Sequence, residues 1–268
     1  MASVEDFLTS LRANAIGWGR DIRAAGAFLT VFPVSMPPGP RGQKATKPPA
    51  SAVRAFPVIG AGVGVVAGAA LLVGNDLGLH PMASALVGLA VAAALTGGLH
   101  EDGLADTADG LGGGRTAAAR LKVMQDSRIG TFGALAIVFS IAIRAAILAG
   151  FATPGIAVLA LIAAGAASRG AMSAVMAAIP TARRQGLAAT FGRPAREDSV
   201  TAALLGGALA LLCLGPLAGI LAVALAVATA FALARLAKRH LGGYTGDVLG
   251  ALQQACEIAV LLAVAAIG

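Results

Sequence analysis

The chain has 268 residues, of which 57% are hydrophobic and only 12% are charged, and its mean hydropathy is +0.83. Soluble domains carry about 25% charged residues, so this composition excludes an ordinary soluble globule, a disordered chain and a nucleic-acid-binding domain. The net charge of +7 does not indicate nucleic-acid binding, because the positions of the cations are better explained by a membrane. A transmembrane β-barrel would show alternating segments of about ten residues, whereas the apolar runs here are continuous and longer.

Seven apolar stretches approach the length of about 20 residues that a helix needs to cross the hydrocarbon core. In chain order they are 53–74, 81–99, 130–150, 155–179, 199–214, 217–236 and 248–267. Only Gly215-Pro216 separates the short fifth stretch from the sixth, so these two form either a tight hairpin of spans or one broken, re-entrant element. The sequence therefore predicts an all-α, polytopic membrane helical bundle with about seven transmembrane helices.

Lys and Arg residues mark one side of this predicted bundle. Seven of the 20 precede the first span, and groups of four, four and three follow the second, fourth and sixth spans. The remaining connections and the C-terminal tail have none, while Arg144 and Arg169 lie inside spans. Cytoplasmic loops are enriched in Lys and Arg, so we expect a cytoplasmic N-terminus. Residues 1–32 show no cleavable signal peptide and are interpreted as an interfacial helix or loop.

Acidic residues are concentrated after the second span, where Glu101, Asp102, Asp106 and Asp109 fall within nine positions. On a helix the three aspartates share an arc of roughly 60°, whereas Glu101 points off this face and is expected to be solvated. Crowded carboxylates at the end of an apolar span repel one another unless a cation neutralises them. Oxygen ligands of this kind suit Mg²⁺, which is commonly shared with a substrate phosphate. The pattern predicts a metal–phosphate site at the membrane–cytosol interface; a solvated juxtamembrane helix and an acid-lined ion pathway are the alternatives.

Further polar segments fall on the same predicted side. Asp126 and Arg128 precede the third span, Arg183 and Arg184 follow the fourth, and a glycine-rich turn carries Thr245 and Asp247. Guanidinium groups bind phosphate oxygens in a bidentate manner, so one face offers both acids for a metal and arginines for phosphates. The arginines after the fourth span could equally serve as topology signals that contact anionic lipid.

Residues inside or next to the spans have several interpretations. Arg169 should face a partner or a cavity, and Arg144 is a candidate ion-pair partner for Glu257. His100 could act as a base, as a phosphate donor or as a structural hydrogen-bonding group. The four-residue spacing of Gly60, Gly64 and Gly68 predicts close helix packing, and the glycines around 97–114 could let the backbone approach a bulky ligand.

The run HEDGLADTADG at 100–110 closely resembles the signature of the cobalamin synthase (adenosylcobinamide-GDP ribazoletransferase) family. Three further elements match in order: DSRIGT at 126–131, SRG at 168–170, and GGYTGD at 242–247 with LGA at 249–251. The start FLTVFPV at 28–34 is also similar, so the resemblance covers roughly 22–267. Glu101 departs from the pattern, because members of this family are expected often to carry an apolar residue there.

The resemblance implies a single catalytic membrane domain at 22–268, preceded by an N-terminal extension at 1–21. It implies a bacterial inner-membrane transferase that joins adenosylcobinamide-GDP to α-ribazole, or to its 5′-phosphate, with release of GMP. The partners are these two small molecules and membrane lipid, with no nucleic acid, and the active site faces the cytoplasm. The oligomeric state, the lower base and the number of metal ions stay open.

The resemblance also implies roles for the site residues. Asp102, Asp106 and Asp109 would hold Mg²⁺, with Asp126 and Asp247 completing a second metal site or binding the nucleotide together with Thr245. The phosphate-binding arginines would be Arg128, Arg169 and Arg183. The proton of the attacking ribose hydroxyl would go to His100 or to a carboxylate, with Asp109 as the first candidate.

Three rival functions remain at this stage. A CDP-alcohol phosphotransferase performs similar chemistry, but Asp102-Gly103 is followed by Ala105-Asp106 in place of that family's Ala-Arg, and its distal aspartate pair is missing. A membrane prenyltransferase typically shows two acidic motifs, of which one is evident. A proton-coupled transporter would explain acids in a membrane without catalysis, but here the acids lie at one interface and no internal repeat is evident.

Overall fold

The computed structural model describes residues 4–34, 48–183, 186 and 191–267, and the part of the chain that it describes is helical with no strands. The N-terminal half contains α1 (Val4–Leu29), the 3-10 helix η2 (Ala50–Ala55), α2 (Phe56–Asp76), α3 (Pro81–Thr96), α4 (Leu99–Gly113) and α5 (Ala117–Val123). The C-terminal half contains α6 (Thr131–Gly150), α7 (Pro154–Ala178), α9 (Arg196–Leu241) and α10 (Gly246–Ala265). The predicted all-α fold is confirmed.

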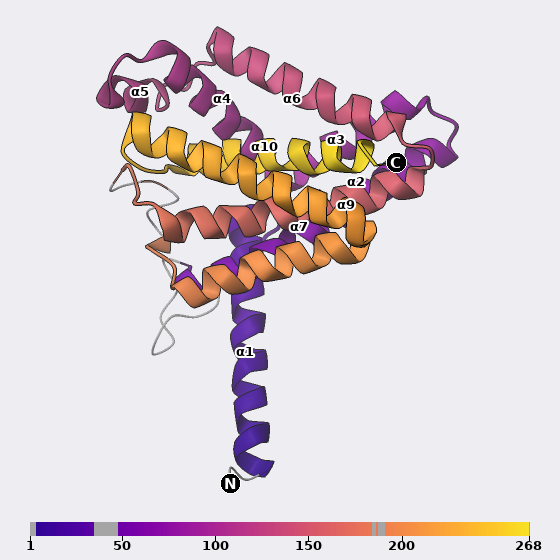
Figure 1. Ribbon diagram of the computed structural model, residues 1–268, viewed down its shortest axis with the longest axis vertical. Coiled ribbons are helices and arrows are strands. Elements are labelled where there is room, and N and C mark those ends of the chain that lie inside the picture. Colours follow the sequence, from indigo (N-terminus) through magenta and orange to yellow (C-terminus); the bar gives the residue numbers. More distant parts are fainter. Residues whose placement is uncertain (1–3, 35–47, 184–185, 187–190, 268) are drawn as a thin grey trace.

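The long apolar helices run side by side, and α7 and α10 form the centre of the bundle (Figure 1). Among the described residues, five helices are long and apolar enough to cross a membrane, and six if α3 and α4, which are bent by 90°, count as one span. Many large apolar side chains lie exposed on the outer helices, as expected for a protein whose solvent is lipid. A polytopic membrane bundle therefore fits, and the count of seven spans stays a prediction.

The region around 199–236 lies within α9, which is broken at Gly215. Gly215 adopts a left-handed backbone conformation (φ 74°, ψ 176°) and Pro216 follows it, so the helix breaks there. A Cβ atom on Gly219 would lie 2.8 Å from the Cα of Leu211, which shows that the two arms pack against each other. The element is therefore a helical hairpin, and its two arms fold back on each other in Figure 1.

The glycine spacing in α2 has the packing role that the sequence predicted. A Cβ on Gly64 would lie 2.5 Å from the backbone oxygen of Leu161, and one on Gly60 would collide with Gly165. The backbones of α2 and α7 therefore touch directly, which is typical of membrane helices whose interfaces carry small residues.

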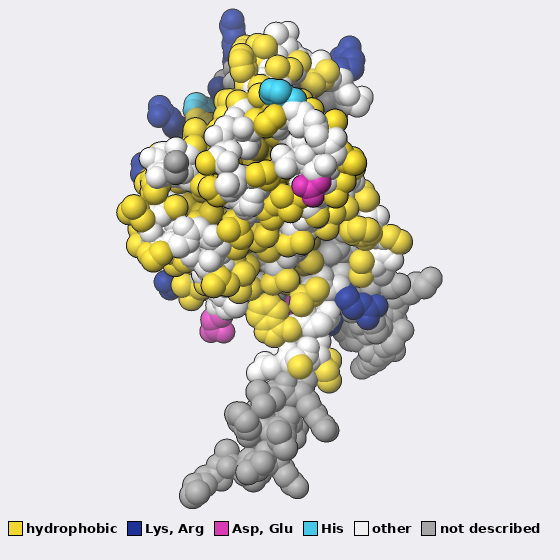
Figure 2. Space-filling model, turned by 90° about the vertical axis from the view of Figure 1, so that its right-hand side faces the viewer, with side chains coloured by type: hydrophobic (Ala, Val, Ile, Leu, Met, Phe, Trp, Pro, Cys, Tyr) yellow, Lys and Arg dark blue, Asp and Glu magenta, His cyan; other side chains and the backbone are white. Residues whose placement is uncertain are grey.

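The connections without Lys or Arg, at 75–80, 151–154 and 215–216, lie at the end of the bundle that also holds the C-terminus (Figure 1). Figure 2 looks onto this end, where most side chains are apolar and the Lys and Arg groups sit toward the margins. Helices α4 and α5 lie at the opposite end. Among the described residues, the connections without Lys or Arg thus lie at the end opposite α4 and α5, while the direction of the N-terminus across a membrane stays a prediction.

Helix α1 projects away from the bundle, across the direction of the other helices (Figure 1). Its C-terminal part is held by the fully buried Asp21, whose carboxylate accepts hydrogen bonds from Arg54 at 2.6 Å and from Ser51 at 3.0 Å. The guanidinium of Arg54 also lies over the ring of Trp18. The expected boundary between 1–21 and 22–268 therefore falls inside one continuous helix.

Candidate functional site

The acidic segment forms its own helix because two glycines redirect the chain. Gly97 (φ 65°) ends α3 and Gly98 (φ 69°) begins α4, and both are in the left-handed region that glycine enters at no steric cost. The chain turns by 90° between the two helices. Helix α4 is not one of the five helices that could span a membrane by themselves. It lies toward one end of the bundle in Figure 1, and its acids lie there with it.

Close backbone contact between α4 and α10 brings the acids of the two helices together. A Cβ on Gly103 would lie 2.7 Å from the backbone oxygen of Asp247, and one on Gly250 would lie 3.2 Å from the Cα of Gly103. The suggestion that glycines in this region leave space for a ligand is wrong for Gly103, because the backbone of α10 fills that space.

Asp109 has a structural role that the sequence did not reveal. Its carboxylate accepts hydrogen bonds from the backbone N–H groups of Gly130 at 2.7 Å and Gly133 at 2.8 Å. These are free N–H groups at the start of α6, so Asp109 satisfies them and places its charge at the positive end of a helix. Both oxygens of Asp109 are thereby engaged.

The environment of Asp106 raises the pKa of its carboxyl group. Partial burial, followed by the carboxylates of Asp102, Asp247 and Asp109, raises its pKa to about 6 against an opposing effect of Arg183. A carboxylate that resists ionisation in this way marks a region of negative charge that the protein itself does not fully neutralise. A bound cation, or protonation of one carboxyl group, would reduce this repulsion.

The predicted metal ligands do not form a finished metal site. Among the described residues, no three His, Cys, Asp or Glu side chains are close enough to hold a metal ion. Asp126 instead forms a two-bond ion pair with Arg128, at 2.7 and 3.0 Å, and this pair is exposed. The hydrogen bonds from Arg128 lower the pKa of Asp126 to about 2. The structure therefore brings Asp102, Asp106 and Asp247 near one another but holds Asp126 and Arg128 in a separate pair.

A cavity of about 170 Å³ opens next to these acids, between α1, α4, α7 and α10. Five of the predicted site residues line it: His100, Asp102, Arg183, Thr245 and Asp247. The guanidinium of Arg183 lies 3.5 Å from Asp247 and also donates a hydrogen bond to the backbone of Leu121. Arg184 lies outside the described residues.

The glycine-rich turn before α10 positions this side of the cavity. Gly242 is left-handed (φ 84°), and Gly243 packs so closely on Pro180 that no side chain would fit. Tyr244 then pairs with the segment after α7, donating its backbone N–H to Pro180 and accepting from Ala182. Thr245 caps α10 by accepting from the N–H of Val248 at 3.2 Å, and its hydroxyl donates to Asp247 at 3.1 Å.

His100 lies in the wall of the cavity and is almost completely buried. Neither of its ring nitrogens has a hydrogen-bond partner among the described residues. Burial lowers its pKa well below the ordinary value, and the charges of Arg169 and Arg144 lower it further. The imidazole is therefore neutral at pH 7, with one donor and one acceptor free for a ligand.

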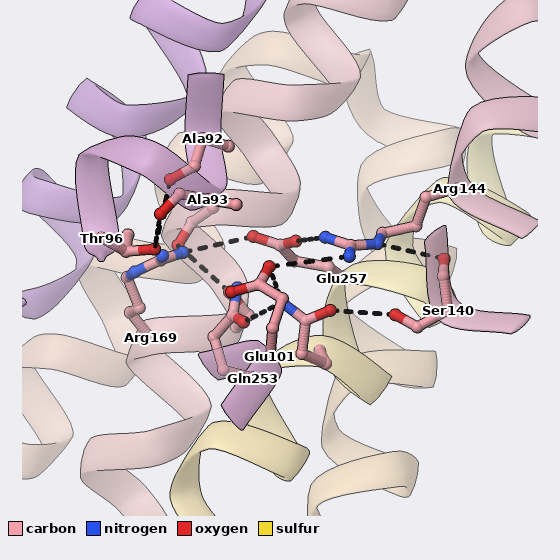
Figure 3. Close-up of polar contacts among 12 residues, drawn as sticks. Ala92, Ala93, Thr96, Glu101, Ser140, Arg144, Arg169, Gln253 and Glu257 are labelled. Carbon is pink, nitrogen blue, oxygen red and sulfur yellow. Dashed lines mark hydrogen bonds and ion pairs between the residues drawn. The ribbon is translucent and has the colours of Figure 1, made fainter. Parts of the chain in front are cut away.

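A cluster of four charged residues includes the two arginines that act on His100. It consists of Glu101, Arg144, Arg169 and Glu257, here called the ionic quartet (Figure 3). Glu257 accepts from Arg144 at 3.1 Å and from Arg169 at 3.3 Å, which confirms the predicted Arg144–Glu257 pair. The side chain of Arg169 is only 2% exposed and does not line the cavity. The structure thus places Arg169 beside Glu257 and outside the cavity lining, and its predicted phosphate contact stays a prediction.

Glu101 belongs to this quartet, so the expectation that it is solvated is wrong. Its carboxylate accepts from the amide of Gln254 at 2.9 Å and lies 3.7 Å from Arg144, with the side chain 17% exposed. Gln254 also accepts from Ser140 at 2.9 Å and donates to Gln253. The sequence analysis missed Gln253 and Gln254, although two adjacent amides inside an apolar span were a visible signal.

Comparison with known proteins points to one family. Residues 21–265 match the cobalamin-5-phosphate synthase family. Proteins named adenosylcobinamide-GDP ribazoletransferase are 44% identical in Bradyrhizobium diazoefficiens, over 92% of this chain and 93% of the relative, and 44% identical in Azorhizobium caulinodans, over 91% and 94%. A relative of the same name from Rhizobium etli is 46% identical over 80% of this chain and 85% of its own length. No solved structure matches. The chain belongs to the cobalamin-5-phosphate synthase family.

Proposed function

We propose that this protein is a membrane transferase that joins adenosylcobinamide-GDP to α-ribazole, or to α-ribazole 5′-phosphate, and releases GMP. Its family and the names of its relatives support this reaction, which belongs to the last steps of cobalamin biosynthesis. The observation that carries the proposal is the cavity at one end of an apolar bundle, where Asp102, Asp247 and Arg183 lie together. Family membership also favours this reaction over a CDP-alcohol phosphotransferase and over a transporter.

In this reaction a ribose hydroxyl attacks the phosphorus on the cobinamide side of the diphosphate, and the bond to the GMP oxygen breaks. Arg183 lines the cavity and is the arginine that binds the phosphate oxygens. The proton of the hydroxyl passes to one of the two predicted candidates that line the cavity, Asp102 or His100. Asp109 is less suited to this role because two backbone N–H groups already occupy its oxygens.

The acids around Asp106 fit a divalent cation that arrives with the substrate. Mg²⁺ usually binds proteins through one or two carboxylates and completes its shell with water and substrate phosphates, so a finished three-residue site is not required. The proposed ligands come from Asp102, Asp106 and Asp247; burial and the charges of the other two carboxylates raise the pKa of Asp106. When bound, Mg²⁺ would neutralise charge on the diphosphate and on the departing GMP.

The proposed location is the bacterial inner membrane, with the acidic end of the bundle toward the cytoplasm. The charge pattern of the connections supports this orientation, because the basic segments that the structure describes at 114–130 and at the end of α9 lie at the end that carries α4 and α5. Water-soluble GMP would then be released on the side where nucleotides are used.

The test is GMP release by purified protein in detergent or liposomes, supplied with adenosylcobinamide-GDP, α-ribazole phosphate and Mg²⁺. We expect GMP and a cobamide in equal amounts, loss of both with EDTA, and a loss of at least a hundredfold for Asp106→Asn, as is typical when an electrostatic group at the reacting centre is removed. The matched control is Asp76→Asn, since Asp76 is exposed at the opposite end of the bundle. Near-normal turnover by a folded Asp106→Asn protein would exclude the metal role, and CMP formation from a CDP-alcohol would exclude the reaction.

A further inference from the structure

The cavity changes its chemical character with depth. Its inner wall is formed by the buried side chains of Met172 and Met176 on α7, Phe191, and Leu249 on α10. Its mouth is formed by the exposed residues Asp102 and Thr181 and by the partly exposed side chains of Arg183 and Asp247. An occupant must therefore combine an apolar part that lies inside with a polar part that faces the acids and the arginine.

The inner wall suits a flat aromatic group. Phe191 is held edge-on against Phe28 at 4.5 Å and against Phe56 at 5.5 Å, so the aromatic side of the cavity is fixed by packing. The two methionines that also line the cavity are adaptable, and their sulfur atoms make favourable contacts with ring edges. A planar ring inside the cavity would have both kinds of side chain as neighbours.

The size of the cavity limits what can enter. Its volume of about 170 Å³ is close to the roughly 150 Å³ of an engineered protein cavity that binds benzene. One small ring system fits in such a space, whereas a corrin macrocycle does not. The corrinoid substrate must therefore remain outside the mouth.

The buried part of the cavity also has few free polar groups. Thr245 is occupied as the cap of α10 and as a donor to Asp247, whereas His100 has no partner at either ring nitrogen. A guanine base has several hydrogen-bonding groups along its edges, which would lose their water without replacement among methionine and phenylalanine. A benzimidazole-like base has one free ring nitrogen, which matches the single unpartnered imidazole.

From these observations we infer that the cavity is the binding site for the aromatic base of the ribazole substrate, with His100 hydrogen-bonded to the base. The ribose then lies at the mouth, next to Asp102 and Arg183, and the guanosine and corrinoid parts of the second substrate lie outside. This inference rests on the proposed function, because that function supplies the two substrates between which the cavity selects.

The test separates the two substrates by their KM values. Met176→Ala removes part of the inner wall, so the KM for α-ribazole should rise about tenfold, in line with the effect of lost methylene contacts in apolar pockets, while the KM for adenosylcobinamide-GDP stays constant. Met82→Ala is the matched control, because Met82 is partly buried at the far end of α3 and does not line the cavity. A rise in the KM for adenosylcobinamide-GDP alone would assign the cavity to the nucleotide and overturn the inference.

Wild-type protein gives an independent test that needs no variant. In equilibrium dialysis with labelled α-ribazole and no second substrate, free benzimidazole should displace the label and guanine should not. Displacement by guanine alone, or by neither base, would overturn the inference. Failure of the proposed function has a different signature, namely absence of GMP release by wild-type protein, whatever the result of the dialysis.

Discussion

The ionic quartet gives a quantitative prediction for stability, because its charges balance inside an apolar bundle. Glu257 bridges the two guanidiniums, whose side chains are 4% and 2% exposed, while Glu101 approaches Arg144 at 3.7 Å. Glu257→Gln keeps the shape of the side chain but leaves two buried cations facing one anion. Breaking a buried pair by removing one partner typically costs about 3–5 kcal/mol, since the remaining charge is left uncompensated.

This loss should be visible in thermal unfolding of the detergent-solubilised protein. For chains of this size each kcal/mol lowers Tm by roughly 2–4 °C, so Glu257→Gln should lower Tm by about 10 °C. The double variant Glu257→Gln with Arg144→Met restores neutrality and should be more stable than Glu257→Gln alone, as expected for coupled residues. The matched control is Glu197→Gln, an exposed residue in the first turn of α9, which should leave Tm unchanged.

Two Tm results would contradict the pairing of charges in the ionic quartet. A Tm for Glu257→Gln close to that of wild type would show that the four charges do not depend on one another. A double variant less stable than Glu257→Gln alone would show that Arg144 stabilises the bundle by packing and not by pairing with Glu257.

Three further predictions concern the packing around the site. Gly103→Val should abolish GMP release, because a Cβ there collides with the backbone of Asp247 and forces α4 away from α10. Gly64→Val should prevent stable folding, because the backbones of α2 and α7 touch at that point. A Cβ on Gly62 would meet nothing within 4 Å, so Gly62→Val should leave expression and Tm as in wild type. Equal behaviour of the two variants would contradict the close packing of α2 on α7. Asp109→Ala should cost about 1 kcal/mol through loss of the cap on α6, measured as a lower Tm, and an unchanged Tm would argue against that role.

Much of the architecture was predictable because membrane helices are encoded locally. A continuous apolar run must become a helix in lipid, where every backbone polar group needs an internal partner. The break at Gly215-Pro216, the small-residue face of α2 and the alternation of basic connections are also local signals, and the structure contains the hairpin, the close contact and the two distinct ends of the bundle. The acidic motif at 100–110 was sufficient to suggest the family.

The roles of individual polar residues depended on which helices lie next to one another. Helical periodicity shows that Glu101 and Asp102 point in different directions, but not that one meets Gln254 and Arg144 while the other opens to the cavity. Asp109 resembled its neighbours in sequence, yet the start of α6 lies against it. Spacing along one helix specifies angles around its own axis, whereas partners come from long-range packing, and only packing decides whether a buried charge is neutralised by a neighbouring side chain or is left to meet a ligand.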